Sequence, residues 1–112
     1  MISRTIFVVL GWAAFSPACA EEGALTVGIG RESCAYWQSS PSRRSEGAVW
    51  IYGFWTAYNH ANEQNRMVGR HTDALGKVAE VKKTCDARPS MLLVDATAHT
   101  YWEMAKRDAA KP

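Results

Sequence analysis

Residues 47–62, GAVWIYGFWTAYNHAN, constrain the fold most strongly, because they carry five aromatic side chains within nine positions. A helix over this stretch would be apolar around most of its circumference and would have to be largely enclosed by other elements. A buried strand is the alternative, since aromatic residues favour sheets, but a run of about a dozen residues is long for one strand. The stretch therefore predicts a helix. Its broad face would carry Trp50, Ile51, Phe54, Trp55 and Tyr58, its third side Tyr52, Thr56 and Asn59, and a small-residue flank, open to close approach by a neighbour, Val49, Gly53 and Ala57.

The first 20 residues, MISRTIFVVLGWAAFSPACA, are organised like a secretory signal peptide, with Arg4, an apolar run over 6–15 and a final Ala-Cys-Ala. This pattern predicts cleavage after Ala20 and a mature chain that begins at Glu21. The apolar run is too short to cross a bilayer, and no later segment reaches spanning length. We therefore expect a periplasmic protein with no membrane span. A lipoprotein modified at Cys19 is the alternative.

Cleavage would leave two cysteines, Cys34 and Cys85. An even number of cysteines in an oxidising compartment makes a disulfide the default expectation. The bridge would close a loop of about fifty residues and stabilise the fold by roughly 4 kcal/mol in the chain-entropy description. The alternative is two free thiols with a catalytic role, for which the Cys-x-x-Cys spacing is missing.

The charge of the mature chain is close to balance. The sequence has 13 basic and 11 acidic residues, and Arg4 leaves with the signal peptide, so the net charge is +1 with neutral histidines. Because no basic stripe is visible, we expect no nucleic-acid partner. The length allows one domain, which we place at 31–108, between a flexible N-terminus at 21–30 and a C-terminal tail at 109–112. The apolar residues of that N-terminus that could reach the core are Leu25, Val27 and Ile29.

Further helices are expected on both sides of the aromatic one, so the predicted fold is all-α, a small orthogonal bundle of three to four helices stapled by one disulfide. Thr72 or Asp73 can cap the third helix, and Pro89 suits the first turn of the last one. The predicted segments are a short helix at 31–38, a turn at 39–47, a polar loop at 62–71, a helix at 73–85 and a final helix at 90–106. The apolar face of the final helix would carry Leu93, Val94, Ala98, Tyr101, Trp102 and Ala105.

Three histidines, His60, His71 and His99, are the first candidates for catalysis or metal binding. His60 and Glu63 are three residues apart and could share a helical face, but no second ligand pair stands at a recognised spacing. No serine occupies a Gly-x-Ser-x-Gly elbow. We therefore expect no catalytic residues, no metal and no cofactor, and we do not expect an enzyme.

The aromatic residues are the remaining candidates for function. Nine of them, including four Trp, belong to the mature chain and supply ample area for a core. Most should be buried, yet Tyr52, Trp55 and Trp102 are more rings than a small bundle can easily hide, which leaves an exposed patch for a protein partner or for a homodimer. The candidate partner-binding residues are Trp50, Tyr52, Phe54, Trp55, Tyr58 and Trp102.

Four motifs, CAYW, WIYGFWTAYN, TDAL and KKTCDARPSMLLVDA, resemble those of small exported helical proteins of the HdeA/HdeB type. The resemblance covers residues 34–104. Its most specific elements are two cysteines that flank an aromatic-glycine-aromatic helix and a Cys-x-x-x-Pro step before the last helix. Proteins of this type are periplasmic, all-helical and stapled by one disulfide, so the resemblance implies a bridge between Cys34 and Cys85. The named members act as acid-stress chaperones, and immunity proteins that neutralise type VI secretion amidases have a similar plan.

A chaperone role also has a physical basis in the charge of the chain. Below about pH 3 the 11 carboxylates are mostly neutral, while the 12 basic residues and three histidines of the mature chain give +15. Self-repulsion of this size favours opening of the fold, and a disulfide limits the expansion. We therefore expect the aromatic residues to form a core at neutral pH and to bind unfolding client proteins in acid.

Two other classes of function remain open. A specific binding or immunity protein would use a fixed surface, such as the loop at 59–70 with Arg66 and Arg70, and would form a stoichiometric complex at neutral pH. An enzyme would have to use one of the three histidines.

Overall fold

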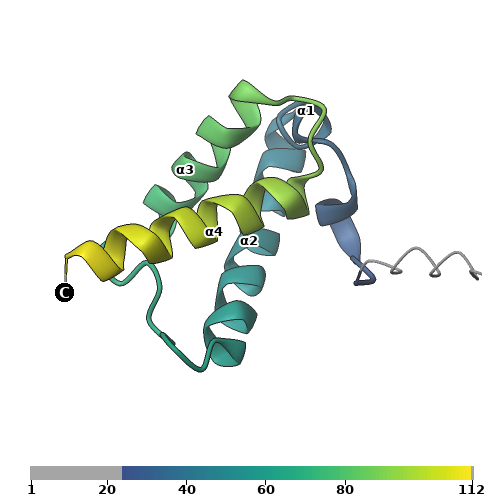
Figure 1. Ribbon diagram of the computed structural model, residues 1–112. Coiled ribbons are helices and arrows are strands. Elements are labelled where there is room, and N and C mark those ends of the chain that lie inside the picture. The colour runs from purple at the N-terminus through teal and green to yellow at the C-terminus, as the bar shows by residue number, and fades with distance from the viewer. Residues whose placement is uncertain (1–23, 112) are drawn as a thin grey trace, which may run out of the picture.

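Four α-helices and a short 3₁₀ turn form residues 24–111, the part of the chain that the computed structural model describes. They are η1 (Gly28–Arg31), α1 (Cys34–Trp37), α2 (Pro41–Ala61), α3 (Ala74–Ala87) and α4 (Leu93–Ala110). α4 runs across α2 and α3, and α1 lies where α2 begins and α3 ends (Figure 1). Within the described range no strand occurs beyond an isolated bridge between Ser33 and Leu92. The predicted all-α, small orthogonal bundle is confirmed.

The N-terminal segment is partly folded against α2. The predicted signal peptide at 1–20, with Cys19, lies outside the described residues. Of the predicted flexible N-terminus at 21–30, Ile29 is buried in the core, while the side chains of Leu25 and Val27 are exposed. The indole Nε1 of Trp50 donates a hydrogen bond to the Val27 carbonyl at 2.8 Å. One of the three apolar residues therefore reaches the core, and the backbone before it is held by Trp50.

α2 begins at Pro41, so the prediction of a turn over 39–47 was wrong for most of that range. Proline fits the first helical position because its missing N–H has no partner there in any case. Ser40 caps the helix by accepting a hydrogen bond from the Arg43 backbone N–H at 3.2 Å. The added turns bring Gly47 against Trp37, where a Cβ would come within 2.1 Å of the indole ring, so only glycine fits this contact.

One side of α2 is left uncovered, which corrects the prediction that the helix is largely enclosed. Ile51 and Trp55 are buried, but Val49 is 69 % exposed and a Cβ on Gly53 would meet nothing within 4 Å. The small-residue flank therefore faces open space instead of a close neighbour. The reason is the number of partners, since the two other long helices, α3 and α4, both pack on the same side of α2 (Figure 1).

α3 begins where the sequence predicts, after Asp73. The carboxylate Oδ1 of Asp73 accepts a hydrogen bond from the Gly76 backbone N–H at 2.7 Å and so satisfies one of the free donors of the first turn. At the other end of the chain, α4 continues through Ala110, two residues into the predicted tail at 109–112.

α4 begins at Leu93, so the prediction that Pro89 stands in its first turn was wrong. The carbonyl oxygens of Pro89 and Met91 instead accept hydrogen bonds from the backbone N–H groups of Ala35 and Cys34, at 2.9 and 2.8 Å. These donors belong to the first turn of α1, where no partner exists within the helix. The segment before α4 is therefore held as a turn because it completes α1.

The buried face of α4 is rotated from the predicted one. Two threonines, Thr97 and Thr100, are buried, and their hydroxyls donate to the carbonyl oxygens of Leu93 and Ala96 at 2.7 and 2.8 Å. Burial costs little when a polar group keeps a hydrogen bond, so these residues can face the core although they are polar. The predicted apolar face did not include them. The observed face is Leu93, Ala96, Thr97, Thr100, Tyr101 and Met104.

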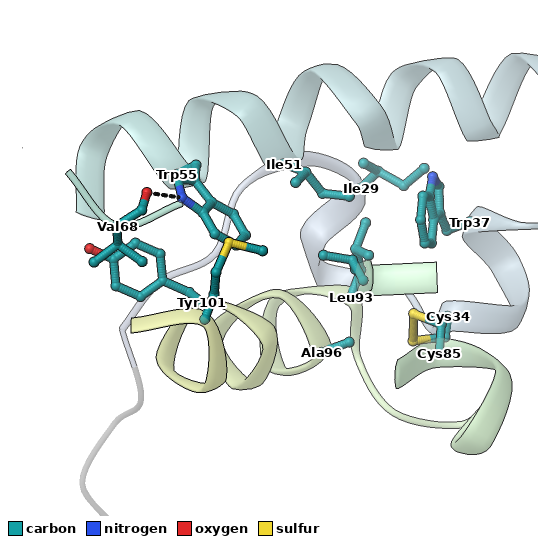
Figure 2. Close-up of a cluster of buried hydrophobic side chains, with 12 residues drawn as sticks. Ile29, Cys34, Trp37, Ile51, Trp55, Val68, Cys85, Leu93, Ala96 and Tyr101 are labelled. Carbon is teal, nitrogen blue, oxygen red and sulfur yellow. Dashed lines mark hydrogen bonds between the residues drawn. A yellow bond between two sulfur atoms is a disulfide. The ribbon is translucent and has the colours of Figure 1, made fainter. Parts of the chain in front are cut away.

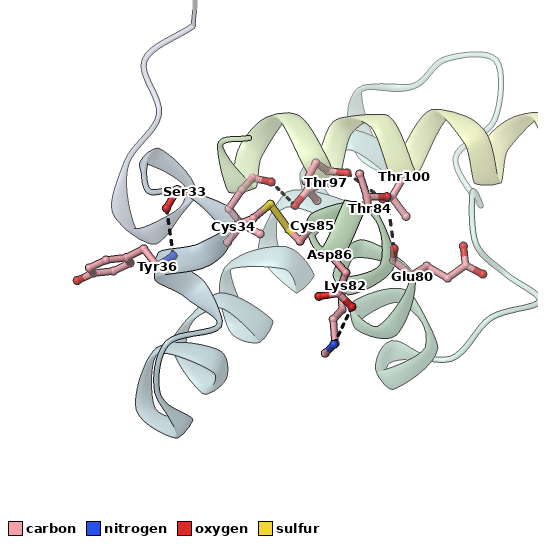
Figure 3. The surroundings of a disulfide bond; sticks show 12 residues. Ser33, Cys34, Tyr36, Glu80, Lys82, Thr84, Cys85, Asp86, Thr97 and Thr100 are labelled. Carbon is pink, nitrogen blue, oxygen red and sulfur yellow. Dashed lines mark hydrogen bonds and ion pairs between the residues drawn. A yellow bond between two sulfur atoms is a disulfide. The ribbon is translucent and has the colours of Figure 1, made fainter. Parts of the chain in front are cut away.

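The disulfide joins α1 to the end of α3 at one end of the core (Figure 2). Cys34 of α1 and Cys85 of α3 are fully buried and bridged, with Cα atoms 5.1 Å apart, which confirms the predicted pairing (Figure 3). The Thr84 and Thr100 hydroxyls lie 3.0 Å apart next to the bridge and join α3 to α4. A row of buried side chains runs from this bridge to Trp55 and Tyr101 (Figure 2). Its members are Ile29, Cys34, Trp37, Ile51, Trp55, Val68, Val81, Cys85, Leu93, Ala96, Tyr101 and Met104.

Replacing both cysteines by serine should lower the free energy of unfolding at pH 7 by about 4 kcal/mol, because the bridge closes a separation of 51 residues. Urea denaturation of the mature chain, followed by tryptophan fluorescence, measures this change. Wild-type protein that has been reduced and reoxidised is the matched control and should unfold like the untreated protein. A loss below about 1 kcal/mol would show that the bridge adds little to the helical packing.

Candidate functional site

The six predicted partner-binding residues separate into two surfaces and one buried position. Four of them form a line of neighbouring rings along one flank of α2 and onto α4. Ring centroids are 5.5 Å apart for Trp50 and Phe54, 3.9 Å for Phe54 and Tyr58, and 6.4 Å for Tyr58 and Trp102. Three of these rings are half-buried, and Trp102 is 50 % exposed. We call Trp50, Phe54, Tyr58 and Trp102 the aromatic strip.

Trp55 lies inside the molecule instead of on a surface. It is 4 % exposed, and its ring meets the edge of Tyr101 with centroids 5.2 Å apart. Its Nε1 donates a hydrogen bond to the Val68 carbonyl at 2.9 Å (Figure 2). Tyr52, the sixth predicted residue, is half-buried on the flank of α2 opposite the strip.

Residues 62–73, which we call the covering loop, close the core over Trp55. Val68 is buried, and its carbonyl accepts hydrogen bonds from both Trp55 and Asn59 of α2. The next residue, Gly69, donates its backbone N–H to the Oδ2 of Asp108 on α4 at 2.7 Å. The loop is thus tied to α2 by a carbonyl and to α4 by a carboxylate.

A second set of hydrogen bonds fixes the start of the covering loop. The Tyr101 hydroxyl donates to the Oδ1 of Asn59 at 2.8 Å and accepts from the Nδ2 of Asn62 at 3.2 Å. The Oδ1 of Asn62 accepts from the backbone N–H groups of Gln64 and Asn65. Among the described residues, no buried side-chain nitrogen or oxygen lacks a partner. The loop therefore has a defined conformation at neutral pH.

A pocket of about 420 Å³ opens between α2, the covering loop and the start of α3. Gly69 turns the backbone here with φ +85°, a left-handed conformation that glycine adopts without a steric cost. Lys77 of α3 lies half-buried beside this turn, and its ammonium donates to the carbonyl oxygens of Gly69 and Thr72. The pocket residues are Tyr52, Trp55, Thr56, Asn59, Arg66, Met67, Val68, Gly69, Arg70, Thr72, Asp73, Ala74 and Lys77.

Ion pairs connect the helices at the surface. Arg107 of α4 contacts both carboxylate oxygens of Glu80 on α3 at 2.9 Å, and these hydrogen bonds raise the pKa of Arg107. Within α3, the hydrogen bond from Lys82 lowers the pKa of the exposed Asp86. The Arg107–Glu80 pair therefore links α4 to α3, whereas the Lys82–Asp86 pair lies within α3 alone.

The three histidines are all exposed and lie on different segments. His60 ends α2, His71 accepts a hydrogen bond from the Nε of Arg70 at 3.1 Å, and His99 is on α4. Among residues 24–111, no three His, Cys, Asp or Glu side chains gather as they would around a metal ion. Nor is any helix in this range both long and apolar enough to cross a membrane.

Asp108, Lys77 and Tyr101 are the site residues that sequence reasoning missed. Asp108 and Tyr101 act on residues about forty positions away, at Gly69 and Asn59, and no local pattern signals such contacts. Lys77 stands within an amphipathic helix, where a lysine is usually a solvated residue. The sequence did point to the loop itself, because the loop at 59–70, with Arg66 and Arg70, was named as a possible fixed binding surface.

Comparison of the chain with protein-family models, with curated proteins and with solved structures gave no match. The resemblance to HdeA/HdeB proteins therefore rests on the residue motifs alone. The aromatic strip, the covering loop and the pocket are therefore the features of the molecule that bear on its function.

The hydrogen bond between Asp108 and Gly69 should be a measurable part of the stability. We expect Asp108→Ala to lower the free energy of unfolding at pH 7 by about 1–2 kcal/mol, as for other hydrogen bonds to charged groups. Backbone amide hydrogen exchange at residues 67–70 should accelerate more in this variant than exchange at Cys34 and Cys85. Glu103→Ala removes an exposed carboxylate of the same helix and should change stability by less than about 0.5 kcal/mol. Equal effects of the two variants would contradict a specific role for Asp108.

Proposed function

We propose that this chain is an exported, non-enzymatic acid-stress chaperone of the periplasm. It binds unfolding proteins through aromatic residues that the covering loop shields at neutral pH. The observation that carries the proposal is the contact of the Asp108 carboxylate with Gly69, because it makes closure over Trp55 depend on a group that acid neutralises.

Carboxylates hold the covering loop and its surroundings at three places. Asp108 binds the middle of the loop, Asp73 caps α3 at the end of the loop, and Glu80 joins α3 to Arg107 on α4. All three interactions are made by ionised carboxylates, so strong acid, which protonates carboxylates, weakens them together. A neutral acceptor makes roughly half as strong a hydrogen bond as an ionised one. Acid therefore loosens the loop end of the molecule at several points together.

The charged groups that remain favour opening. Lys77 donates to the carbonyl of Gly69, whose N–H binds Asp108, and the charge of Asp108 also acts on Arg107. When acid neutralises the carboxylates, these two cations keep their charge. With a mature-chain charge near +15, repulsion adds to the loss of the carboxylate contacts.

Within residues 24–111, one carboxyl group, that of Asp86, has a clearly shifted pKa, and the sign of its effect agrees. Hydrogen bonding to Lys82 lowers the pKa of Asp86 below its ordinary value of 3.8. When the pKa of a carboxyl group is lower in the folded than in the unfolded state, the group stabilises the fold above the unfolded pKa. This stabilisation is lost as the pH falls through the folded pKa. The pair is exposed, so its effect is small, but its direction also favours opening in acid.

The disulfide keeps the opened chain compact. Cys85 is near the end of α3, whereas the covering loop enters its start, so the covalent link is at the opposite end of the helix (Figure 1). Opening can then uncover Trp55 and Tyr101, which join the half-exposed aromatic strip, without full unfolding. Apolar rings in a positively charged, soluble chain are suited to binding the exposed cores of other proteins.

At pH 2.5, the oxidised mature chain should suppress the aggregation of acid-labile exported proteins, measured by light scattering. Trp102→Ala removes the most exposed ring of the strip and should weaken suppression about threefold or more, because interface energy concentrates in aromatic residues. Val49→Ala, on the uncovered side of α2, is the matched control and should leave suppression unchanged. Absence of suppression by the wild-type chain would overturn the proposal.

A specific protein-binding or immunity role is the second candidate. The defined covering loop, with Arg66 and Arg70 beside the pocket, favours it, because a fixed cationic surface suits recognition of one partner at neutral pH. Such a protein would inhibit a partner such as a secreted effector. A stoichiometric complex at pH 7 that is lost in Arg66→Gln and Arg70→Gln would support this role over the chaperone.

A further inference from the structure

The floor of the pocket is largely aromatic and apolar, and the side-chain donors of Trp55, Asn59 and Thr56 are already used. The Nε1 of Trp55 and the Nδ2 of Asn59 both donate to the Val68 carbonyl. The Thr56 hydroxyl donates to the carbonyl of Tyr52. What the floor offers a ligand is therefore the half-buried Tyr52 ring and the side chain of Met67, which is 59 % exposed, whereas Trp55 is only 4 % exposed behind them.

The rim of the pocket carries an excess of positive charge. Arg66, Arg70 and Lys77 line it, and none of them pairs with a carboxylate in the described part of the chain. The one acidic lining residue is Asp73, whose Oδ1 is used by the Gly76 N–H at the start of α3. The lining residues thus carry a net charge of +2.

Lys77 is held in place more firmly than a surface lysine. Two backbone carbonyls, of Gly69 and Thr72, receive hydrogen bonds from its ammonium, which also lies 5.8 Å from the centroid of the Trp55 ring. An ammonium has three N–H donors, so one remains for a ligand. A fixed cation above an aromatic floor, with two guanidinium groups at the rim, is suited to a carboxylate attached to an apolar group.

We propose that this pocket binds an organic carboxylate at neutral pH, with the carboxylate at Arg66, Arg70 and Lys77 and an apolar side group on Tyr52 and Met67. The volume of about 420 Å³ lies within the range of about 300–1,000 Å³ that is usual for small-molecule sites and leaves room for a group the size of one amino acid. Two sources share this chemistry: a free acid of amino-acid size, or the C-terminal carboxylate of a polypeptide. The proposal is independent of the chaperone activity, which concerns the opened state.

The test is a titration of the ¹⁵N-labelled, oxidised mature chain at pH 7, followed by NMR. The probes are N-acetyl-phenylalanine, its carboxamide, and a hexapeptide that ends in phenylalanine with a free or an amidated C-terminus. We expect saturable shifts of the Trp55 indole N–H and of the Gly69 and Arg70 amides with the acids. The matched amides should bind at least about tenfold more weakly, because they lack the charge.

Variants of the rim complete the test without disturbing the core. Arg66→Gln and Arg70→Gln are exposed and should each weaken binding of the acids about tenfold, whereas Arg31→Gln, outside the pocket, should not. Stronger binding of the free-acid hexapeptide than of N-acetyl-phenylalanine assigns the site to polypeptide ends, and the reverse assigns it to small acids. Absence of shifts at millimolar probe, equal binding of acids and amides, or shifts confined to the aromatic strip would overturn the proposal. Because everything is measured at pH 7, failure here leaves the chaperone assay unaffected.

Discussion

The rest of the structure depends on the contact between the covering loop and Trp55, in which the Trp55 indole N–H donates to the Val68 carbonyl. Trp55 and Tyr101 are the large rings at one end of the core row, and the covering loop closes over Trp55 there (Figure 2). The other end of that row is closed covalently by Cys34 and Cys85. The molecule therefore has one end fixed by a bond that acid does not affect and one end closed by hydrogen bonds, of which the contact with Asp108 is charged.

This asymmetry connects the two proposals. At neutral pH the closed loop shapes the pocket, because Gly69 supplies both the turn at its wall and the carbonyl that fixes Lys77. The proposed opening in acid would release the same residue from Asp108, so the pocket and the cover over Trp55 would be lost together. A carboxylate ligand would be neutralised in acid as well. Under the two proposals, the closed and open states would therefore present different surfaces.

Much of the fold could be predicted from local signals, and much of the site could not. Asp73 before an apolar pattern indicates the start of α3. The two cysteines that remain after the predicted signal cleavage indicate the bridge, because their number is even. Serine followed by proline is common both in turns and at the start of helices. The sequence alone could therefore not show that Ser40-Pro41 begins α2. Contacts such as Asp108 with Gly69 arise only when distant segments pack. Which aromatic rings are half-exposed also depends on that packing, as Trp55 and Trp102 illustrate.

The most direct test of the account is the solvent protection of the Trp55 indole N–H in the oxidised mature chain at pH 7 and pH 2.5, measured as an exchange protection factor by NMR. The account predicts that this N–H, bound to the Val68 carbonyl at neutral pH, loses its protection in acid. The amide of Cys34 beside the disulfide should stay protected. A Trp55 indole N–H that is as protected at pH 2.5 as at pH 7 would contradict the account, because the core would then remain closed under the conditions in which it is proposed to act.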